Sequence, residues 1–403
     1  MRRIFQLVFI WLIIFAGLGQ SQNLYVPTDF PTIQSAIDAA VNGDIIIVAP
    51  STYCETINFL GKTITVKSSG EPHKTFISGN ISSGSVVSFV NGETSKSVID
   101  GFTILGGTGT SISDVNSGGG IFCQNSSPII KNCIILSNNV GLGTGGGIAC
   151  YDSSPTIAKC KIINNSAQYG GGIYCVNESS PVIANTIIAQ NDLGLYGSGV
   201  YCDSGSSPYI SKCTIADNNN GVYCSENSNA TINNSIIWNN GDDLYGCSAT
   251  YSCIEEDDAG IGNIHSNPLF NGNEWIKVTV CMITRGGGIG TRIVWAQNTD
   301  YHLRYNSPCI DAGDPSSFEN EPLPNGGRID MGAYGNTPEA TRSISLVGDI
   351  TEDGEVDFED IYLLAEQWLQ PPDNPLADVA PIPADGIVNF LDFSLLAENW
   401  MKE

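Results

Sequence analysis

Acidic side chains near the end of the chain recur at the spacing of a calcium-binding loop. Counted from residue 349, oxygen-bearing side chains stand at positions 1, 3, 5, 9 and 12, and position 7 offers a backbone carbonyl. These candidate ligands are Asp349, Thr351, Asp353, Glu355 (through its carbonyl), Asp357 and Asp360. Oxygen donors at this spacing suit Ca²⁺ and not zinc, and Gly354 permits the sharp turn that such a loop needs. The sequence therefore predicts a calcium site at residues 349–360.

This acidic loop is repeated 32 residues later, with changes at its start. Ten of sixteen positions are identical between residues 353–368 and 385–400. Pro381 and Pro383 stand where side-chain ligands are expected, so Asp378 can act as the first ligand only around a three-residue insertion. The candidate ligands of the second loop are Asp378, Asp385, Ile387 (through its carbonyl), Asn389 and Asp392. We expect the first loop to bind calcium and the second to bind it weakly or with rearranged ligands.

An amphipathic helix is predicted after each acidic loop. Ile361, Leu364, Ala365 and Trp368 fall at helical spacing, and the second copy repeats this stripe, so the two helices should pack on one another. Paired loop–helix units with Asp at position 12 resemble type I dockerins, over residues 349–401. The resemblance implies Ca²⁺ as the cofactor and a cohesin-type scaffold domain as the docking partner. The residues before position 12, Phe358-Glu359 and Phe390-Leu391, are bulkier than those of the best-known members.

A second candidate site depends on a five-fold repeat between Gly118 and Asn240. Gly-Gly-Gly-Ile-Phe-Cys (118–123) returns four times in similar form, with a period of 22 to 27 residues. Strand side chains alternate between faces, so the residue between the inward Ile and Cys of each copy must point outward. These outward residues are Phe122, Ala149, Tyr174, Tyr201 and Tyr223. Two residues after the cysteines lie the polar residues Asn125, Asp152, Asn177, Ser204 and Glu226.

Stacked in register, these two files would form an aromatic stripe beside a polar file. Sugars bind to such pairings through their C–H faces and hydroxyl groups. We therefore predict substrate binding at Phe122, Tyr174, Tyr201, Tyr223, Asp152, Asn177 and Glu226. The alternative is an outer ladder that stabilises the rungs or lies under a loop.

The sequence does not identify catalytic residues. Lyase chemistry needs carboxylates that bridge calcium and an Arg or Lys base. The repeats contain no Arg, and their lysines are Lys131, Lys159, Lys161 and Lys212. Asp242-Asp243 and Asn298-Thr299-Asp300 echo fragments of hydrolase motifs. The three histidines, His73, His265 and His302, are scattered along the sequence, so a catalytic triad or a zinc site has no support.

The repeats that position these residues predict a parallel β-helix. Each repeat holds short alternating strands broken by Gly, Pro and Asn, and its length suits one turn of a solenoid. A single repeat cannot bury its apolar face, whereas stacked repeats bury a continuous one. Eight of the thirteen cysteines should then stack in inward files, as small buried hydrophobes or, alternatively, as metal ligands or disulfides. The files are Cys123, Cys150, Cys175, Cys202 and Cys224, and Cys133, Cys160 and Cys213. Pairs of asparagines such as Asn164–Asn165 should occupy turns and bond one another across rungs.

The start of the chain predicts export and a cap for the coil. Met-Arg-Arg, an apolar run from Ile4 to Leu18 and small residues indicate a signal peptide at residues 1–21, with a transmembrane helix as the alternative. The exported chain should contain no integral membrane segment. Apolar residues at helical spacing between residues 33 and 41 predict a helix that covers the first rung. Export permits disulfides, for which Cys247, Cys253, Cys281 and Cys309 are candidates, while Cys54 is isolated.

Short motifs flank the repeats on both sides, among them Asp100-Gly-Phe-Thr-Ile104, Ser307-Pro-Cys-Ile-Asp-Ala-Gly313 and Ile329-Asp-Met-Gly-Ala-Tyr334. With the Gly-Gly-Gly-Ile repeats, they resemble secreted right-handed parallel β-helix proteins of the pectin-lyase-like group, over residues 24–335. We therefore predict an all-β right-handed parallel β-helix over residues 22–335, with repeats at 118–240 and a closing region at 265–335. A linker at 336–347 and a small α-helical, dockerin-like domain at 348–403 should follow.

Charge and domain content together narrow the function. The net charge of −25, from 42 acidic and 17 basic residues, makes nucleic acid and anionic membranes poor partners and calcium a good one. We predict an exported, polysaccharide-associated β-helix protein, tethered through its calcium-dependent module, that binds or processes carbohydrate. One alternative is a polysaccharide lyase or glycoside hydrolase acting on plant or algal polysaccharide. The other is a non-catalytic surface adhesin or structural spacer.

Overall fold

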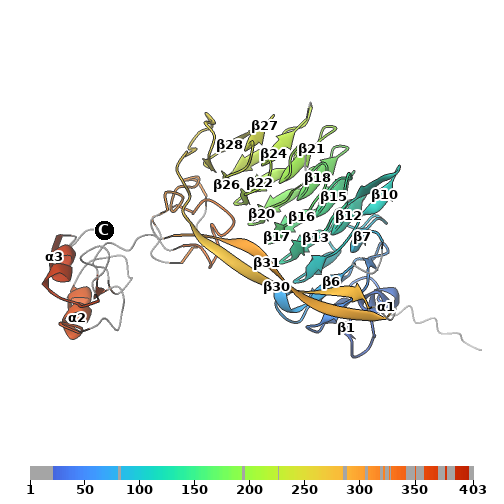
Figure 1. Ribbon diagram of the computed structural model, residues 1–403, viewed down its shortest axis with the longest axis horizontal. Coiled ribbons are helices and arrows are strands. Elements are labelled where there is room, and N and C mark those ends of the chain that lie inside the picture. The colour runs from blue at the N-terminus through green and yellow to red at the C-terminus, as the bar shows by residue number, and fades with distance from the viewer. Residues whose placement is uncertain are drawn as a thin grey trace, which may run out of the picture.

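The main body of the protein is a coil of short parallel β-strands (Figure 1). The computed structural model describes residues 21–79, 83–192, 196–225, 227–284, 288–304, 307–317, 321–322, 326, 328–341, 350, 358–370, 377–378 and 386–398. The predicted leader at residues 1–21 lies outside this part of the chain, except for its last residue. Strands along the coil belong in turn to three sheets, and each pairs in parallel with the strand one coil turn away. The predicted parallel β-helix is confirmed.

Three sheets form the walls of the coil. The first has ten strands: β1 (Asn23–Val26), β2 (Ile45–Val48), β5 (Thr65–Ser68), β8 (Val98–Asp100), β13 (Ile129–Lys131), β16 (Thr156–Ala158), β19 (Val182–Ala184), β22 (Tyr209–Ser211), β25 (Thr231–Asn233) and β28 (Ser248–Thr250). The second has nine: β3 (Thr52–Tyr53), β6 (Phe76–Ser78), β9 (Thr103–Leu105), β14 (Ile134–Leu136), β17 (Lys161–Ile163), β20 (Ile187–Ala189), β23 (Thr214–Ala216), β26 (Ile236–Trp238) and β29 (Cys253–Ile254). The third has eight: β4 (Ile57–Asn58), β7 (Val87–Phe89), β12 (Ile121–Gln124), β15 (Ile148–Tyr151), β18 (Ile173–Val176), β21 (Val200–Cys202), β24 (Val222–Cys224) and β27 (Leu244–Tyr245).

The interior of the coil is built from columns of identical or similar side chains. Ile121 pairs with Ile148, and Cys123 pairs with Cys150, in strict register. Both residues of each Ile-x-Cys unit are buried in the main core, as the alternation predicts. The eight cysteines of the two files are buried free thiols, so they act as small apolar residues and not as disulfides.

An asparagine ladder runs inside one corner of the coil. Its members are Asn138, Asn165, Asn191, Asn218 and Asn240. Each side-chain amide donates to the next asparagine's Oδ1 at 3.0 to 3.1 Å. The predicted bonding of asparagines across rungs is confirmed, and Asn191, which belongs to no asparagine pair, completes the ladder.

Close approach of neighbouring rungs explains the repeated glycines. Gly118 and Gly145 both have φ of +63°, a left-handed conformation that costs glycine least. A Cβ atom at Gly120 would come within 2.7 Å of the Gly147 carbonyl oxygen on the next rung. Any side chain at this position would therefore push two rungs apart.

A short helix covers the first rung, as predicted. Helix α1 (Ile33–Ala39) begins after Thr32, whose hydroxyl accepts a hydrogen bond from the Ser35 amide. Ile33 and Ile37 are fully buried in the core of the coil. The helix therefore keeps the open end of the solenoid out of water.

A long antiparallel hairpin lies along the outside of the second sheet (Figure 1). It consists of β30 (Phe270–Ile283) and β31 (Ile289–Leu303), which leave the end of the coil and run back toward its first rungs. Val278 and Tyr301 of the hairpin are buried with Leu136 and Ile163 of the second sheet. The sequence did not predict this hairpin. A smaller hairpin, β10 (Thr110–Ile112) and β11 (Val115–Ser117), projects beside the third sheet.

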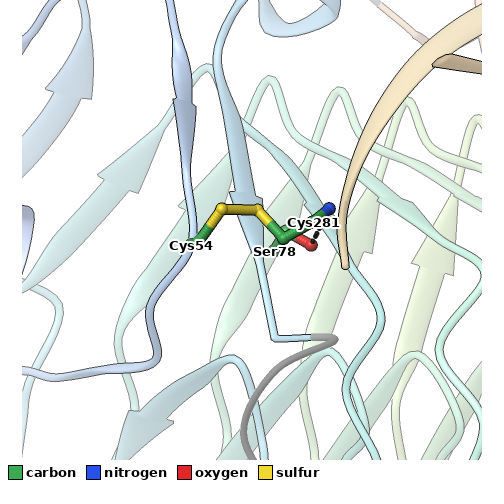
Figure 2. The surroundings of a disulfide bond; sticks show 3 residues. All are labelled: Cys54, Ser78 and Cys281. Atoms are coloured by element: carbon green, nitrogen blue, oxygen red, sulfur yellow. Dashed lines mark hydrogen bonds between the residues drawn. A yellow bond between two sulfur atoms is a disulfide. The ribbon is translucent and has the colours of Figure 1, made fainter. Parts of the chain in front are cut away.

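A disulfide fastens the long hairpin to the beginning of the coil (Figure 2). It joins Cys281 of β30 to Cys54, with Cα atoms 5.8 Å apart and a sequence separation of 227. The backbone N–H of Cys281 also donates to the Ser78 hydroxyl at 3.2 Å. Cys281 was a disulfide candidate, but Cys247, Cys253 and Cys309 are free, and the isolated Cys54 is its partner.

The C-terminal region contains the two predicted helices, α2 (Phe358–Glu366) and α3 (Phe390–Glu398). Leu364 of α2 and Leu396 of α3 are buried in one small apolar cluster, which confirms that the helices pack on one another. Ile350, Ala377 and Val388 complete this cluster.

Part of the predicted linker belongs to the coil's closing region. Thr337 and Ala340 are buried, and the Thr341 hydroxyl donates to the Leu303 carbonyl at 3.0 Å. Residues 342–347 lie outside the described part of the chain. Within that part, every helix is too short or too polar to cross a membrane.

Candidate functional site

The predicted aromatic stripe forms a column on the outer face of the third sheet. Strand register places Phe122, Ala149, Tyr174, Tyr201 and Tyr223 opposite one another in turn. Tyr245 of β27 extends this line of residues by one more rung, and we call the whole line the tyrosine column. The prediction that these side chains share one outward line is confirmed.

The rings of the tyrosine column cover one another's faces. Tyr201 and Tyr223 stack with centroids 5.2 Å apart, and Tyr223 and Tyr245 stack at 4.4 Å, each pair within 3° of parallel. Phe122 and Tyr174 are buried, and Ile112 of β10 packs against them. Sugars stack on free ring faces, and these faces are occupied. The geometry favours the alternative interpretation, in which the column is a ladder that stabilises the rungs.

The column is also poorly suited to proton transfer. Burial, and then the negative charge of Asp203, raise the pKa of Tyr201 to about 12. Burial and the neighbouring Tyr151 raise the pKa of Tyr174 as well. Both phenols therefore stay protonated at neutral pH.

The predicted polar file lies at a turn that follows the strands of the third sheet. Asn125, Asp152, Asn177 and Ser204 adopt left-handed backbone, with φ between 48° and 58°. Asn125 and Asp152 line an open hollow of about 550 Å³ whose described lining, including Glu93, contains no ring of the tyrosine column. Glu226 lies outside the described residues. Sugar binding by rings and polar groups together therefore stays a prediction.

A groove runs between the second sheet and the long hairpin. It consists of two hollows, of about 650 and 540 Å³, which share His73, Ile134 and Lys161 in their lining. The larger hollow also contacts the closing region at Ala333 and Tyr334. The smaller is bordered by Trp275, Ile276, Lys277 and Thr279 of β30. We call the joined hollows the hairpin groove.

Basic side chains line the hairpin groove of this strongly acidic protein. They are Lys159, Lys161, Lys277, His73 and His302. Glu339 is the one carboxylate among the described residues that line it. Lys159 and Lys277 are exposed and form no ion pair within the described residues. A concave surface on which lysines outnumber carboxylates focuses a positive field, so the groove suits an anion.

An Asp–His pair stands at the wall of the groove. His302 Nδ1 lies 2.5 Å from Asp300 Oδ1, and the His302 ring stacks on Tyr334 with centroids 3.6 Å apart. Burial raises the pKa of Asp300, but the hydrogen bonds from His302 outweigh it, so this pKa lies below its usual value. The carboxylate fixes the orientation of the imidazole and leaves Nε2 as the nitrogen that can serve a ligand.

The outer face of the hairpin presents aromatic rings next to these charges. Trp275 and Trp295 are each 61% exposed, and Lys277 pairs directly opposite Trp295. Trp275 also lines the groove. Exposed indole faces on a strand pair that a disulfide holds in place can stack on sugar rings.

This arrangement could be predicted only in part. Asp300 and His302 are two residues apart, so on a strand they share a face. That signal was available, but the strand itself was not recognised. Nothing in the sequence indicated that the hairpin would fold back over residues 159–161.

The other hydrolase-like fragment is structural. Asp243 is buried, accepts from the Asn240 amide at 2.8 Å and from the Glu255 N–H at 3.0 Å, and so ends the asparagine ladder. Burial raises its pKa to about 6.

The described calcium-ligand candidates are positioned by backbone hydrogen bonds. Asp360 and Asp392, at position 12 of each loop, are fully buried, and they accept from the N–H groups of Ile350 and Asn389 at 2.6 and 2.7 Å. Asp378 accepts from Gly386 N–H at 2.6 Å, across the insertion. Buried carboxylates require compensation, so these residues fit a bound cation.

Of the other candidate ligands in these loops, one already accepts a hydrogen bond and six lie outside the described residues. The Ile387 carbonyl accepts from the Asn389 amide at 2.9 Å. Six predicted ligands lie outside the described residues: Asp349, Thr351, Asp353, Glu355, Asp357 and Asp385.

Comparisons with known proteins address the fold. The crystal structure of pectate lyase Pel9A is 13% identical, with a TM-score of 0.40, and the match covers 79% of this chain and 97% of that chain. An alginate lyase from Paenibacillus sp. is 11% identical, with a TM-score of 0.32 and coverage of 57% and 94%. The pectin methylesterase PemA from Erwinia chrysanthemi is 8% identical, with a TM-score of 0.32 and coverage of 68% and 84%. Similarities of this size assign no function. No curated protein matches the chain significantly.

A family model gives the stronger result. The model of the right-handed beta helix region matches residues 34–187 and 156–306, which together span more than half of the chain. These residues include every complete turn of the coil from α1 to β29 and both strands of the long hairpin. The chain belongs to the right-handed beta helix family.

Proposed function

We propose that this protein is exported and binds an acidic polysaccharide in the hairpin groove. The observation that carries the proposal is the basic lining of the groove, with Lys159 and Lys277, on a chain whose net charge is −25. Uronate carboxylates pair with ammonium groups, and sugar rings stack on indoles such as Trp275.

The shape of the groove supports a polymer over a small ligand. The two hollows are open and adjacent, because they share His73, Ile134 and Lys161. Lys159 lines the larger hollow and not the smaller, and Lys277 lines the smaller hollow and not the larger. A chain with a carboxylate on successive sugar units can meet both charges at once, which a monosaccharide cannot.

The C-terminal domain would tether the protein. The proposal rests on the duplicated acidic loops and on the buried Asp360 and Asp392, which suit Ca²⁺. Phe358 and Phe390 are 77% and 69% exposed at the start of the two helices, beside these loops. An apolar surface of this kind fits a cohesin-type scaffold domain with an apolar face as the partner.

A binding assay on immobilised polymers tests the groove. The wild-type protein should be retarded by polygalacturonate and alginate and not by neutral xylan. Replacing both lysines, Lys159→Ala with Lys277→Ala, should weaken binding at least tenfold, because two charge pairs are lost. Lys96→Ala is the matched control, since Lys96 is exposed and does not line the groove. Equal binding of neutral and acidic polymers, or unchanged binding by the double variant, would refute the proposal.

Catalysis is the second candidate function, and the Asp300–His302 pair favours it. In an elimination, a base takes the proton α to the uronate carboxylate, a C=C bond forms, and the glycosidic oxygen leaves with a proton. His302 lines the groove and is oriented by Asp300, so it can serve as that base. Absorbance of unsaturated products from pectin or alginate would appear with wild type and vanish in His302→Gln. Binding without product would identify a non-catalytic protein, and absence of binding would favour the spacer alternative.

A further inference from the structure

Three carboxylates of the closing region meet at one point outside the predicted calcium loops. One oxygen atom from each of Asp311, Glu321 and Asp330 lies within 4.8 Å of the others. These residues come from separate stretches of the chain. The sequence pattern singled out none of them as a metal ligand.

Asp330 is the buried member of this cluster, and one of its oxygens has no partner. Its side chain is 2% exposed. Asp330 Oδ1 accepts from the Asp311 N–H at 3.0 Å, but Oδ2 makes no hydrogen bond among the described residues. A buried carboxylate oxygen without a donor is rare, because it loses its hydration and gains nothing in return. Such an oxygen can accept a positively charged ligand.

Backbone groups hold the other two carboxylates beside Asp330. Glu321 Oε1 accepts from Asp330 N–H at 2.9 Å and from Asn336 N–H. Asp311 Oδ1 accepts from Gly326 N–H at 2.8 Å. A Cβ atom at Gly326 would collide with the Asp311 carboxylate, so the close approach requires glycine.

The nearest basic residue in the sequence does not neutralise the cluster. Arg328 donates through Nε to the Gly313 carbonyl at 2.8 Å and through its terminal nitrogen to the Ala312 carbonyl at 2.8 Å. Among the described residues it forms no ion pair. Its charge is directed at carbonyl groups of the same closing region.

We propose that Asp311, Glu321 and Asp330 bind one divalent cation, Ca²⁺. Calcium–oxygen distances are about 2.3 to 2.6 Å, so oxygens on opposite sides of one ion lie about 5 Å apart. The 4.8 Å limit of the cluster therefore fits a single ion without rearrangement. An all-oxygen, all-carboxylate donor set favours calcium over zinc or copper.

Such an ion would fasten the closing region to the coil. The neighbouring backbone already bonds to late rungs: Asp314 N–H donates to Asn234 Oδ1 at 2.6 Å, and Ala333 N–H donates to the Thr214 hydroxyl at 3.0 Å. Tyr334, four residues after Asp330, lines the hairpin groove. The ion thus stabilises one wall of the groove, a role separate from the tether proposed for the C-terminal loops.

Calcium stoichiometry on the full chain tests the site. In an Asp360→Asn, Asp392→Asn background, which weakens the C-terminal loops, titration calorimetry with CaCl₂ should still show one binding site. Adding Asp330→Asn should remove that site and abolish the rise in Tm that calcium causes. Asp257→Asn, at an exposed carboxylate outside the cluster, is the control and should change neither.

Two results of this titration would overturn the proposed calcium site. No calcium binding in the loop-variant background would overturn the proposal, and so would binding that persists after Asp330→Asn. If Asp330→Asn does not fold, by circular dichroism, Glu321→Gln replaces it, because Glu321 is only partly buried. A Glu321→Gln protein that keeps wild-type calcium affinity in this background would equally contradict the site.

Discussion

Each inward asparagine forms hydrogen bonds with the neighbouring rungs, so replacing it should remove the hydrogen bonds that it makes to them. Asn165 Oδ1 accepts from the Asn138 amide at 3.0 Å, and its own amide donates to the Ile135 carbonyl at 2.9 Å. We predict that Asn165→Ala lowers the free energy of unfolding by about 2–4 kcal/mol, because buried partners lose their hydrogen bonds. Urea unfolding followed by circular dichroism measures this loss. The control, Asn116→Ala, is at an exposed position in β11 and should lower the free energy of unfolding by less than about 0.5 kcal/mol. Equal losses of stability in the two variants would contradict a stabilising role for the ladder.

Asp243 should make stability fall as pH rises. Its pKa is raised to about 6 by burial, from an ordinary value near 4, so the folded state holds the proton more tightly than the unfolded state. Stability from this group is complete below about pH 4 and is lost between about pH 4 and 6, by about 3 kcal/mol. Asp243→Asn should flatten the stability profile over that window. A variant profile parallel to that of wild type would show that Asp243 does not titrate there.

At the residue scale, alternation and spacing predicted which side chains point inward, and they did not predict exposure. Ile121 and Cys123 face the core because a strand alternates, whatever surrounds it. Whether Tyr174 meets water depends on Ile112 and on the next ring in the column, which the local pattern does not encode. The local pattern also does not encode the groove around Lys159 and Lys161, because its other wall is a hairpin that begins more than a hundred residues later.

Among the elements, the long hairpin depends most on one covalent contact. The Cys54–Cys281 disulfide closes a loop of more than two hundred residues, and loops of that length gain most from closure. Replacing both cysteines with serine should lower the free energy of unfolding by about 3 kcal/mol and expose β30 and β31 to proteolysis. Limited proteolysis with mass spectrometry would locate the first cuts. Cys247→Ser, at a free thiol, is the control; identical cleavage of both variants would contradict the fastening role.

Element prediction succeeded where the local pattern and the tertiary context agree. Helix α1 carries its apolar residues at helical spacing and a capping Thr32, so its type and its place at the open end could be predicted. The strands of the long hairpin do not alternate strictly between apolar and polar residues, because apolar residues such as Trp275 and Ile276 stand at successive positions. Their pairing is set by packing on the second sheet, which a linear pattern does not contain.

At the scale of the whole molecule, calcium should act at two places with different consequences. Chelation with EGTA should abolish docking of the C-terminal domain to a cohesin-type partner, because the loops would then lose the cation that balances the buried carboxylates Asp360 and Asp392. Surface plasmon resonance with and without calcium measures this. Asp360→Asn with Asp392→Asn should weaken docking and leave polysaccharide binding in the groove intact. Docking that is insensitive to EGTA would contradict a calcium-dependent tether.

The distribution of charge is the feature that unites fold and function in this account. The chain has a net charge of −25, yet three of its lysines, Lys159, Lys161 and Lys277, line one groove, whose second wall is a disulfide-fastened hairpin. The most direct test is a crystal structure with a bound uronate hexasaccharide. We expect its carboxylates within 3.5 Å of Lys159 and Lys277 Nζ, as in ordinary charge-assisted hydrogen bonds of roughly 2.7–3.2 Å, and one ring over Trp275. An oligosaccharide bound on the tyrosine column, or an empty groove at saturating ligand, would contradict the account.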